Sequence, residues 1–135
     1  MSCKSAIYTA NTGAQAVAVG GTISLGSIIR RFGCGVNLNG NGIVIDREGY
    51  YDVAASVTVA ATAAGAVTVT LLRDGVAVPG ATATGTAAAA GDSVNLSIDA
   101  LVRQAGCCAG GSTLTLVLTA GAGTVNNVAL KVIKL

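Results

Sequence analysis

The residues best suited to chemistry are four cysteines, in a chain without histidine. They are Cys3, Cys34, Cys107 and Cys108. A structural zinc site usually pairs its thiolates with two to four residues between them, and no pair here has this spacing. Disulfides are the other chemistry open to them, and disulfides persist in oxidising compartments. Adjacent Cys107 and Cys108 cannot readily bond to each other, because disulfide geometry normally needs Cα atoms farther apart than neighbouring residues lie.

Three interpretations of these cysteines stay open: disulfides within or between subunits, a zinc site, and free thiols. Cys3 lies near the N-terminus, from which it could reach a neighbouring subunit. Cys34 and the Cys107-Cys108 pair lie in glycine-rich segments typical of loops. We treat all four as candidate disulfide residues and predict no metal ligand.

Catalysis finds little support in the remaining polar residues. General acid–base chemistry needs a titrating group held close to another functional group. The chain has six Asp and Glu in total, and the pattern places them in turns or at strand edges. Asp46 and Glu48, for example, flank Arg47 as in a solvated turn. An Asn-rich stretch at 37–41 could supply oxygens to Ca²⁺, but its Asn-Gly steps are better explained as turns. We predict no catalytic or cofactor-binding residue, and hence no enzyme.

Composition indicates one domain that associates with other chains. The 135 residues are 52% hydrophobic but only 3% aromatic, and only 10% are charged. About a quarter is usual for the charged fraction, so a lone monomer would expose much apolar surface, which often marks an interface. The net charge is +2, and the only basic pair is Arg30-Arg31, which does not make a nucleic-acid surface.

A membrane span is not expected either. Residues 53–72 carry no charge over a length that could cross a bilayer. They alternate with Ser and Thr, however, and are interrupted at 63–65, so two strands and a turn explain them better than a helix. The N-terminal residues lack the apolar region of a secretory signal, and we therefore expect no export signal.

The most regular stretch, residues 49–59, must be a central strand. Its apolar residues alternate with Tyr50, Asp52, Ala54, Ser56 and Thr58, and this period of two places the sets on opposite faces. Residues 92–99 alternate in the same way. We predict a set of residues that form the core and lie on the strands that build a trimer. They are Tyr51, Val53, Val57, Val59, Val94, Leu96 and Ile98.

Turn signals recur every 8–12 residues along the rest of the chain, which is typical of a sandwich or jelly roll. Asp74-Gly75 predicts a hairpin turn. Pro79-Gly80 is expected to end a strand, and the Ala/Thr/Gly run at 81–90 is a loop or an edge strand. We predict an all-β jelly-roll sandwich of about eight to ten antiparallel strands. Residues 1–20 are expected to be an N-terminal arm or first strands with an anchoring role, and residues 21–135 the jelly-roll domain.

Three segments resemble a known family. The segment Gly49-Tyr50-Tyr51-Asp52-Val53 resembles the G-x-Y-x-F step in the globular heads of complement-type collagenous proteins, with Val53 in place of Phe. Residues 71–76, LLRDGV, are similar to the family's L-x-K-N-G hairpin. Residues 91–96, GDSVNL, are similar to its G-D-x-V-x-L strand. The three matches follow the family's order and span the middle third of the chain.

The resemblance is to the bacterial and phage versions of this tumour-necrosis-factor-like jelly roll, which include the C-terminal heads of collagen-like spore-surface glycoproteins. It implies a ten-stranded jelly roll and a homotrimer that buries one sheet of each subunit. It also implies surface decoration or ligand binding rather than catalysis. Two departures are the scarcity of core aromatics and the absence of a collagen-like stalk, which argues against a stalk-tip role.

These observations predict a non-enzymatic structural protein, a trimeric jelly roll on the surface of a phage virion. A capsid decoration protein or head fibre needs no export signal, because lysis releases the particle. The expected partners are other copies of the chain and a capsid or surface-layer protein, the latter reached through the N-terminal arm; no cofactor, nucleic acid or membrane is expected. Two alternatives are a disulfide-linked spore or cell-surface appendage and a ligand- or glycan-binding head.

Overall fold

The chain folds into β-strands that form two antiparallel sheets. The computed structural model describes residues 4–33, 35–104 and 111–135, and within these ranges it contains strands but no helix. The strands are β1 (Ala6–Asn11), β2 (Gln15–Val17), β3 (Ser27–Phe32), β4 (Val36–Asn39), β5 (Gly42–Ile45), β6 (Gly49–Ala61), β7 (Gly65–Arg73), β8 (Val76–Ala87), β9 (Ser93–Gln104), β10 (Ser112–Ala120) and β11 (Gly123–Lys134). The all-β prediction is confirmed, with β2 as a short addition to the expected eight to ten strands.

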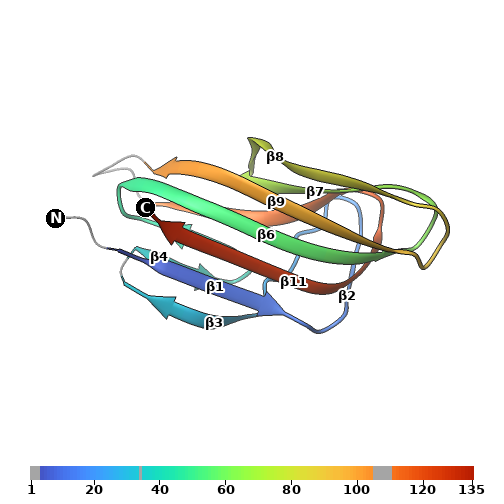
Figure 1. Cartoon of the computed structure of the whole chain (residues 1–135), viewed down its shortest axis with the longest axis horizontal. Helices are drawn as coiled ribbons and strands as arrows, with labels where there is room; N and C mark the ends of the chain where they lie inside the picture. Colours follow the sequence, from blue (N-terminus) through green and yellow to red (C-terminus); the bar gives the residue numbers. More distant parts are fainter. Residues whose placement is uncertain (1–3, 34, 105–110) are drawn as a thin grey trace.

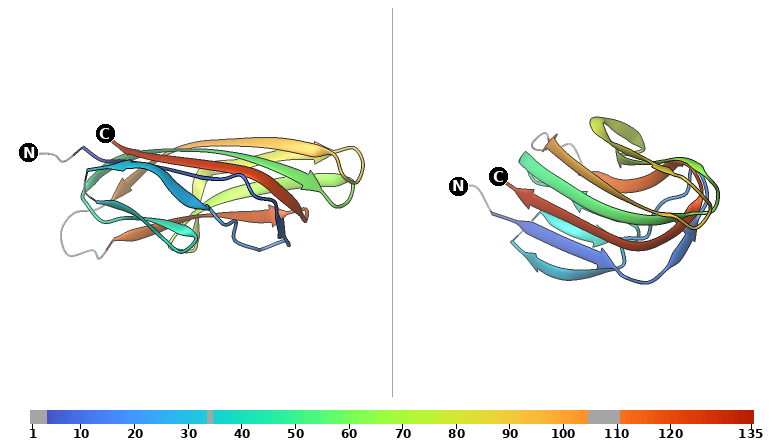
Figure 2. Two further views of the ribbon diagram at one scale, coloured as in Figure 1. Left: turned by 90° about the horizontal axis from the view of Figure 1, so that it is seen from below. Right: turned by 45° about the vertical axis from the view of Figure 1, so that its right-hand side comes forward.

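The two sheets stack as a sandwich, which Figure 2 shows from two directions. Sheet A has the strand order β3-β1-β11-β6-β9, with β2 also paired to β11, and sheet B has the order β4-β5-β10-β7-β8. Strands distant in sequence therefore lie side by side, and β1 runs next to the C-terminal β11 (Figure 1). This crossing of the chain between two antiparallel sheets confirms the jelly roll. Because β1 is an inner strand of sheet A, residues 6–11 are part of the sandwich.

The core lies between the sheets and consists almost entirely of aliphatic side chains. Along β6, the side chains of Tyr51, Val53, Ala55, Val57 and Val59 are buried, while the residues that alternate with them are partly exposed on the other side of the sheet. Each such Val contributes about 1.5–3 kcal/mol when it leaves water. Tyr51 is the single aromatic side chain in the core, so Val, Ile and Leu fill the space between the sheets.

The hairpin between β7 and β8 forms at Asp74-Gly75, as predicted. Both residues have positive φ, 52° and 82°, which is the backbone of a two-residue turn that matches strand twist. The side chain of Asp74 fixes the turn to the neighbouring strand, since its Oδ1 accepts a hydrogen bond of 2.9 Å from Thr113 N.

The expected strand end at Pro79-Gly80 is wrong. β8 continues to Ala87, but its pairing with β7 shifts from Leu72↔Ala77 to Thr70↔Thr82. Residues 78–81 therefore form a bulge opposite Leu71. A bulge on an edge strand tolerates proline, which has no N–H to give to a ladder. The second half of β8 is the edge-strand alternative that the sequence left open.

The open sides of the sandwich are closed by contacts between the edge strands. On one side β8 approaches β9 so closely that a Cβ on Gly85 would lie 2.3 Å from Val94 Cγ1, which explains glycine there. On the other side Arg31 Nε of β3 donates a 2.7 Å hydrogen bond to the carbonyl oxygen of Val36 in β4.

Within the described ranges, no helix suited to crossing a membrane is present.

Candidate self-association face

Two sets of residues were predicted from the sequence to carry function. The cysteines Cys3, Cys34, Cys107 and Cys108 lie outside the described residues. The second set, Tyr51, Val53, Val57, Val59, Val94, Leu96 and Ile98, is buried between the sheets. These side chains support β6 and β9 from within, so the surface that another chain could touch is made by the residues that alternate with them.

Strand pairing arranges the outward residues of sheet A in straight rows across the sheet. We number three of these rows, starting from the row nearest the C-terminal end of β9. Row one contains Phe32, Ala6, Ile133, Asp52 and Leu101. Row two contains Arg30, Tyr8, Lys131, Ala54 and Asp99. Row three contains Ser27, Ala10, Ala129, Ser56 and Ser97. Consecutive rows lie about 6.8 Å apart along the strands.

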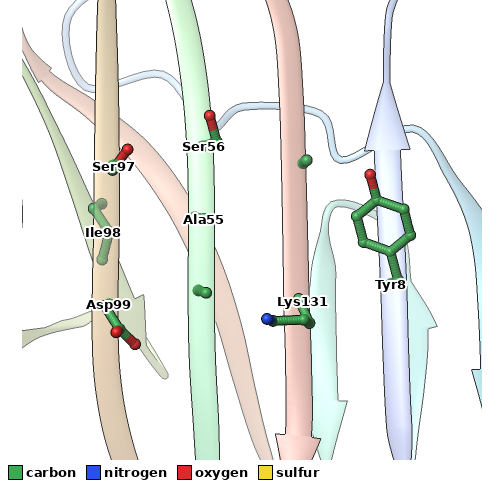
Figure 3. Close-up of a pocket in the computed structure, with 9 residues that line it drawn as sticks. Tyr8, Ala55, Ser56, Ser97, Ile98, Asp99 and Lys131 are labelled. Carbon is green, nitrogen blue, oxygen red and sulfur yellow. The ribbon is translucent and has the colours of Figure 1, made fainter.

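Small side chains hollow out the middle of this face. Ala54, Ser56 and Ala129 form the floor of a shallow furrow of about 420 Å³. Tyr8 and Lys131 stand on one side of it and Asp99 on the other, as Figure 3 shows. An open furrow with a floor of small side chains and charged groups at its sides has the shape to receive part of another protein.

Large apolar side chains on the same face remain exposed, one of them at the furrow and three further along the strands. Tyr8 is 39% exposed, Phe32 56%, Tyr50 50% and Leu101 59%. Tyr8, Tyr50 and Leu101 point outward from sheet A, because the residue next to each of them in its strand is buried in the core. Phe32 points outward because it pairs with Ala6, which lies on the outer face. The outer face of sheet A therefore carries every aromatic side chain of the chain except Tyr51.

The outer face of sheet B is different in chemistry. Threonines of β7, β8 and β10 form a polar ladder in which the hydroxyls bond to one another: Thr68 to Thr84 at 2.9 Å, Thr70 to Thr82 at 3.4 Å and Thr70 to Thr119 at 3.1 Å. Hydroxyls and methyl groups in such a ladder are compatible with water. The two outer faces thus differ in that only the face of sheet A concentrates exposed apolar side chains.

A polar network at one end of the molecule connects the two sheets. Arg73, at the end of β7, donates from Nη1 to the carbonyl of Arg103 at 2.6 Å and from Nη2 to Gln104 Oε1 at 2.8 Å. Its Nε lies 3.2 Å from Ser112 Oγ, which in turn donates to Gln104 Oε1 at 2.7 Å. Gln104 and Ser112 are buried. Sequence reasoning missed this network, because it treated Arg73 only as part of a hairpin.

Tyr51 is a titratable side chain inside the core. Its hydroxyl donates a 2.7 Å hydrogen bond to the carbonyl of Arg47. Burial raises the pKa of Tyr51 above its ordinary value of 10.0, and the charge of Asp46 acts in the same direction. A tyrosine kept neutral inside the core suits a structural role. Among the described residues, no cluster of three or more His, Cys, Asp and Glu could hold a metal ion.

Comparison with known proteins supports the fold alone. No family model matches the chain, and no curated protein is similar in sequence. Solved structures are similar over nearly the whole chain. Murine APRIL superposes with a TM-score of 0.76 at 12% identity, covering 98% of this chain and 99% of that chain.

Two further structures extend this likeness beyond one group of proteins. The globular domain of the zebrafish complement 1qA protein gives a TM-score of 0.70 at 9% identity, covering 93% of this chain and 94% of that chain. The vertex protein P5 of phage PRD1 gives 0.66 at 12% identity, covering 100% and 99%. The predicted TNF-like jelly roll is confirmed as a fold.

Proposed function

We propose that this chain is a non-enzymatic structural protein that assembles as a homotrimer on the surface of a phage virion, as a capsid decoration protein, head fibre or similar accessory. The observation that carries the proposal is the asymmetry between the two outer faces. One face has a furrow and exposes Tyr8, Phe32, Tyr50 and Leu101, whereas the other is a hydrogen-bonded threonine ladder.

Burial of the outer face of sheet A by other copies of the chain explains this asymmetry. Exposed apolar patches of this kind are uncommon on soluble monomers and mark interaction sites. The resemblance to TNF-like heads implies three copies that each bury one sheet, and sheet A is the one with a face suited to burial. The threonine ladder of sheet B would then form the outside of the trimer.

The virion part of the proposal is supported by one structural likeness. The solved chain of the PRD1 vertex protein P5 has a similar fold over nearly all of its residues. A particle protein also needs no catalytic group, in line with a chain whose histidine count is zero. Attachment to a capsid protein through the N-terminal residues belongs to the same proposal.

Native mass of the purified chain, with and without a reducing agent, tests the assembly. We expect the mass of three chains in both conditions. Ladders or fibres that collapse on reduction would instead favour the disulfide-linked appendage and overturn the decoration protein. A stable monomer would contradict the proposal altogether.

Immunogold labelling of lysates tests the location. Particles released by lysis from cells that carry the gene should be labelled at their surface, and the chain should remain with them through density-gradient purification. Labelling confined to intact cells or spores, or recovery of the chain only in the soluble fraction, would contradict a virion protein.

A further inference from the structure

Rows one and two on sheet A carry side chains at their two ends that could complement each other between copies. In row two the β3, β1 and β11 end carries Arg30, Tyr8 and Lys131, and the β9 end carries Asp99. In row one the β3, β1 and β11 end carries the apolar Phe32, Ala6 and Ile133, the β9 end carries Leu101, and Asp52 of β6 lies between the two ends. A positive end thus lies opposite a negative end, and an apolar end opposite an apolar end.

Within one chain these ends do not meet. Lys131 and Asp99 both pair with Ala54 of the strand between them, so the register separates their backbones by two strand spacings, about 9.6 Å. Figure 3 shows the two side chains on either side of β6, with Ala55 and Ser56 of that strand between the flanking strands. Both charged residues are exposed.

Sheet A has two edge strands, β3 and β9, that could enter a furrow on another molecule. Of the two, β9 carries the acidic Asp99, which suits a furrow bordered by Lys131, and its outward residues are exposed along its whole length. Central strands such as β6 and β11 cannot protrude in this way. The small floor residues Ala54, Ser56 and Ala129 allow a neighbouring strand edge to come close.

Symmetry then determines which rows meet. If copies are related by rotation about an axis parallel to the strands, every residue keeps its height along that axis. Residues of one row in one copy therefore face residues of the same row in the next copy. Contacts of this head-to-tail kind join two different patches and close into a ring.

We propose that, in the trimer, the β9 edge of each copy packs on the β1–β11 half of the next copy in matched rows. Asp99 of one copy pairs with Lys131 of the next, and Leu101 packs against Ile133 and Phe32 of the next. This inference rests on the proposed homotrimer and specifies its interface. The ion pair sets the height at which the copies meet, and the apolar side chains at the two ends of row one supply the burial.

Charge reversal tests the pair. Lys131→Asp and Asp99→Lys each place like charges against each other in all three contacts of a trimer. We expect either variant to raise the concentration at which half of the assembly dissociates by about ten-fold or more, given the coupling of close interfacial charge pairs. The variant carrying both substitutions restores opposite charges in every contact, and its midpoint should return to that of the wild type.

An equimolar mixture of the two single variants separates pairing between copies from pairing within a copy. A contact between two different variants has opposite charges in either direction, whereas a contact between two identical variants has like charges. A ring of three contains at least one contact between identical variants. The mixture should therefore assemble better than either variant alone but less well than the double variant.

Glu48→Lys is the matched control, because it changes the charge as Asp99→Lys does at an exposed turn residue before β6. It should leave the midpoint unchanged, and thermal unfolding should verify that all variants are folded. Wild-type midpoints for both single variants would overturn the pairing while leaving the trimer intact. A mixture no better than the single variants would also overturn it, since the charges would then pair within one chain. A monomeric wild type would refute the proposed function and this interface together.

Discussion

Tyr51 shows how a single side chain links the turn before β6 to the core. Its ring lies among aliphatic side chains, while its hydroxyl reaches the carbonyl of Arg47 at 2.7 Å. The hydroxyl of Tyr51 lies at the edge of the core, and its hydrogen bond to Arg47 provides the partner that a buried polar group needs. Burial keeps the phenol neutral, because a phenolate would be poorly solvated there.

The raised pKa of Tyr51 predicts a loss of stability in alkali. Below the ordinary value of 10.0 both the folded and the unfolded states hold the proton, so Tyr51 adds no pH dependence. Above that value the unfolded state releases the proton first, and the free energy of unfolding falls as the pH rises.

Urea unfolding of the wild type and Tyr51→Phe between about pH 8 and pH 11 measures this effect. At about pH 8 the variant should be less stable by about 1 kcal/mol, for the lost hydrogen bond, but its free energy of unfolding should fall less steeply in alkali. Parallel pH profiles for the two proteins would show that Tyr51 ionises equally in both states.

Val57→Asp tests which face of β6 is buried. Val57 lies in the core opposite Leu96 and Val128, so the substitution would bury an unpaired carboxylate. We expect a loss of more than about 3 kcal/mol and no soluble trimer. Thr58→Asp, one residue along and facing outward, should keep the monomer fold by circular dichroism. A folded, soluble trimer of Val57→Asp would mean that the faces are assigned wrongly.

Among the elements, the ends of β7, β9 and β10 are connected by one arginine. Arg73 bonds to the carbonyl of Arg103 and to Gln104 on β9, and to Ser112 on β10. Gln104 is in sheet A and Ser112 in sheet B, so this side chain joins the sheets where β9 ends and β10 begins. The planar guanidinium is needed because three acceptors lie around it.

Arg73→Met should therefore destabilise the fold by about 2 kcal/mol, since it removes charge-assisted hydrogen bonds from buried partners. Arg73→Lys should recover only part of this loss, because an ammonium cannot reproduce the fork. Chemical denaturation gives the free energies, and hydrogen exchange should localise the effect to the end of β9. Equal stability of the Lys variant and the wild type would contradict the requirement for a planar group.

For the whole molecule, the difference between the outer faces makes the assembly directional. Ser56→Arg places a long charged side chain on the floor of the furrow and should leave a folded monomer by native mass. Thr86→Arg makes a similar change at an exposed position on the outer side of sheet B and should keep the trimer. If Thr86→Arg dissociates the assembly and Ser56→Arg does not, sheet B is the interface.

Local features of the sequence determined much of the fold. Alternation of apolar and polar residues in β6 and β9 follows directly from the period of a strand, and it identified the core side chains. The Asp74-Gly75 turn was predictable because few residues adopt its backbone. The bulge at Pro79 was not predictable from the sequence. An edge strand can loop out several residues and then resume pairing, and whether it does so depends on the partner strand β7 rather than on β8 itself.

The candidate interface required the tertiary structure. Lys131 and Asp99 are 32 positions apart in the sequence (131 minus 99), and nothing local relates them. They share a row because both strands pair with β6 in registers that the whole sandwich fixes. By itself the sequence determined three features: the alternation of buried and outward side chains along the strands, the turn at Asp74-Gly75, and the low charge of the surface. Which residues meet across a sheet, and so which face carries the aromatics, was decided by packing between distant strands, because a register is a property of the pair.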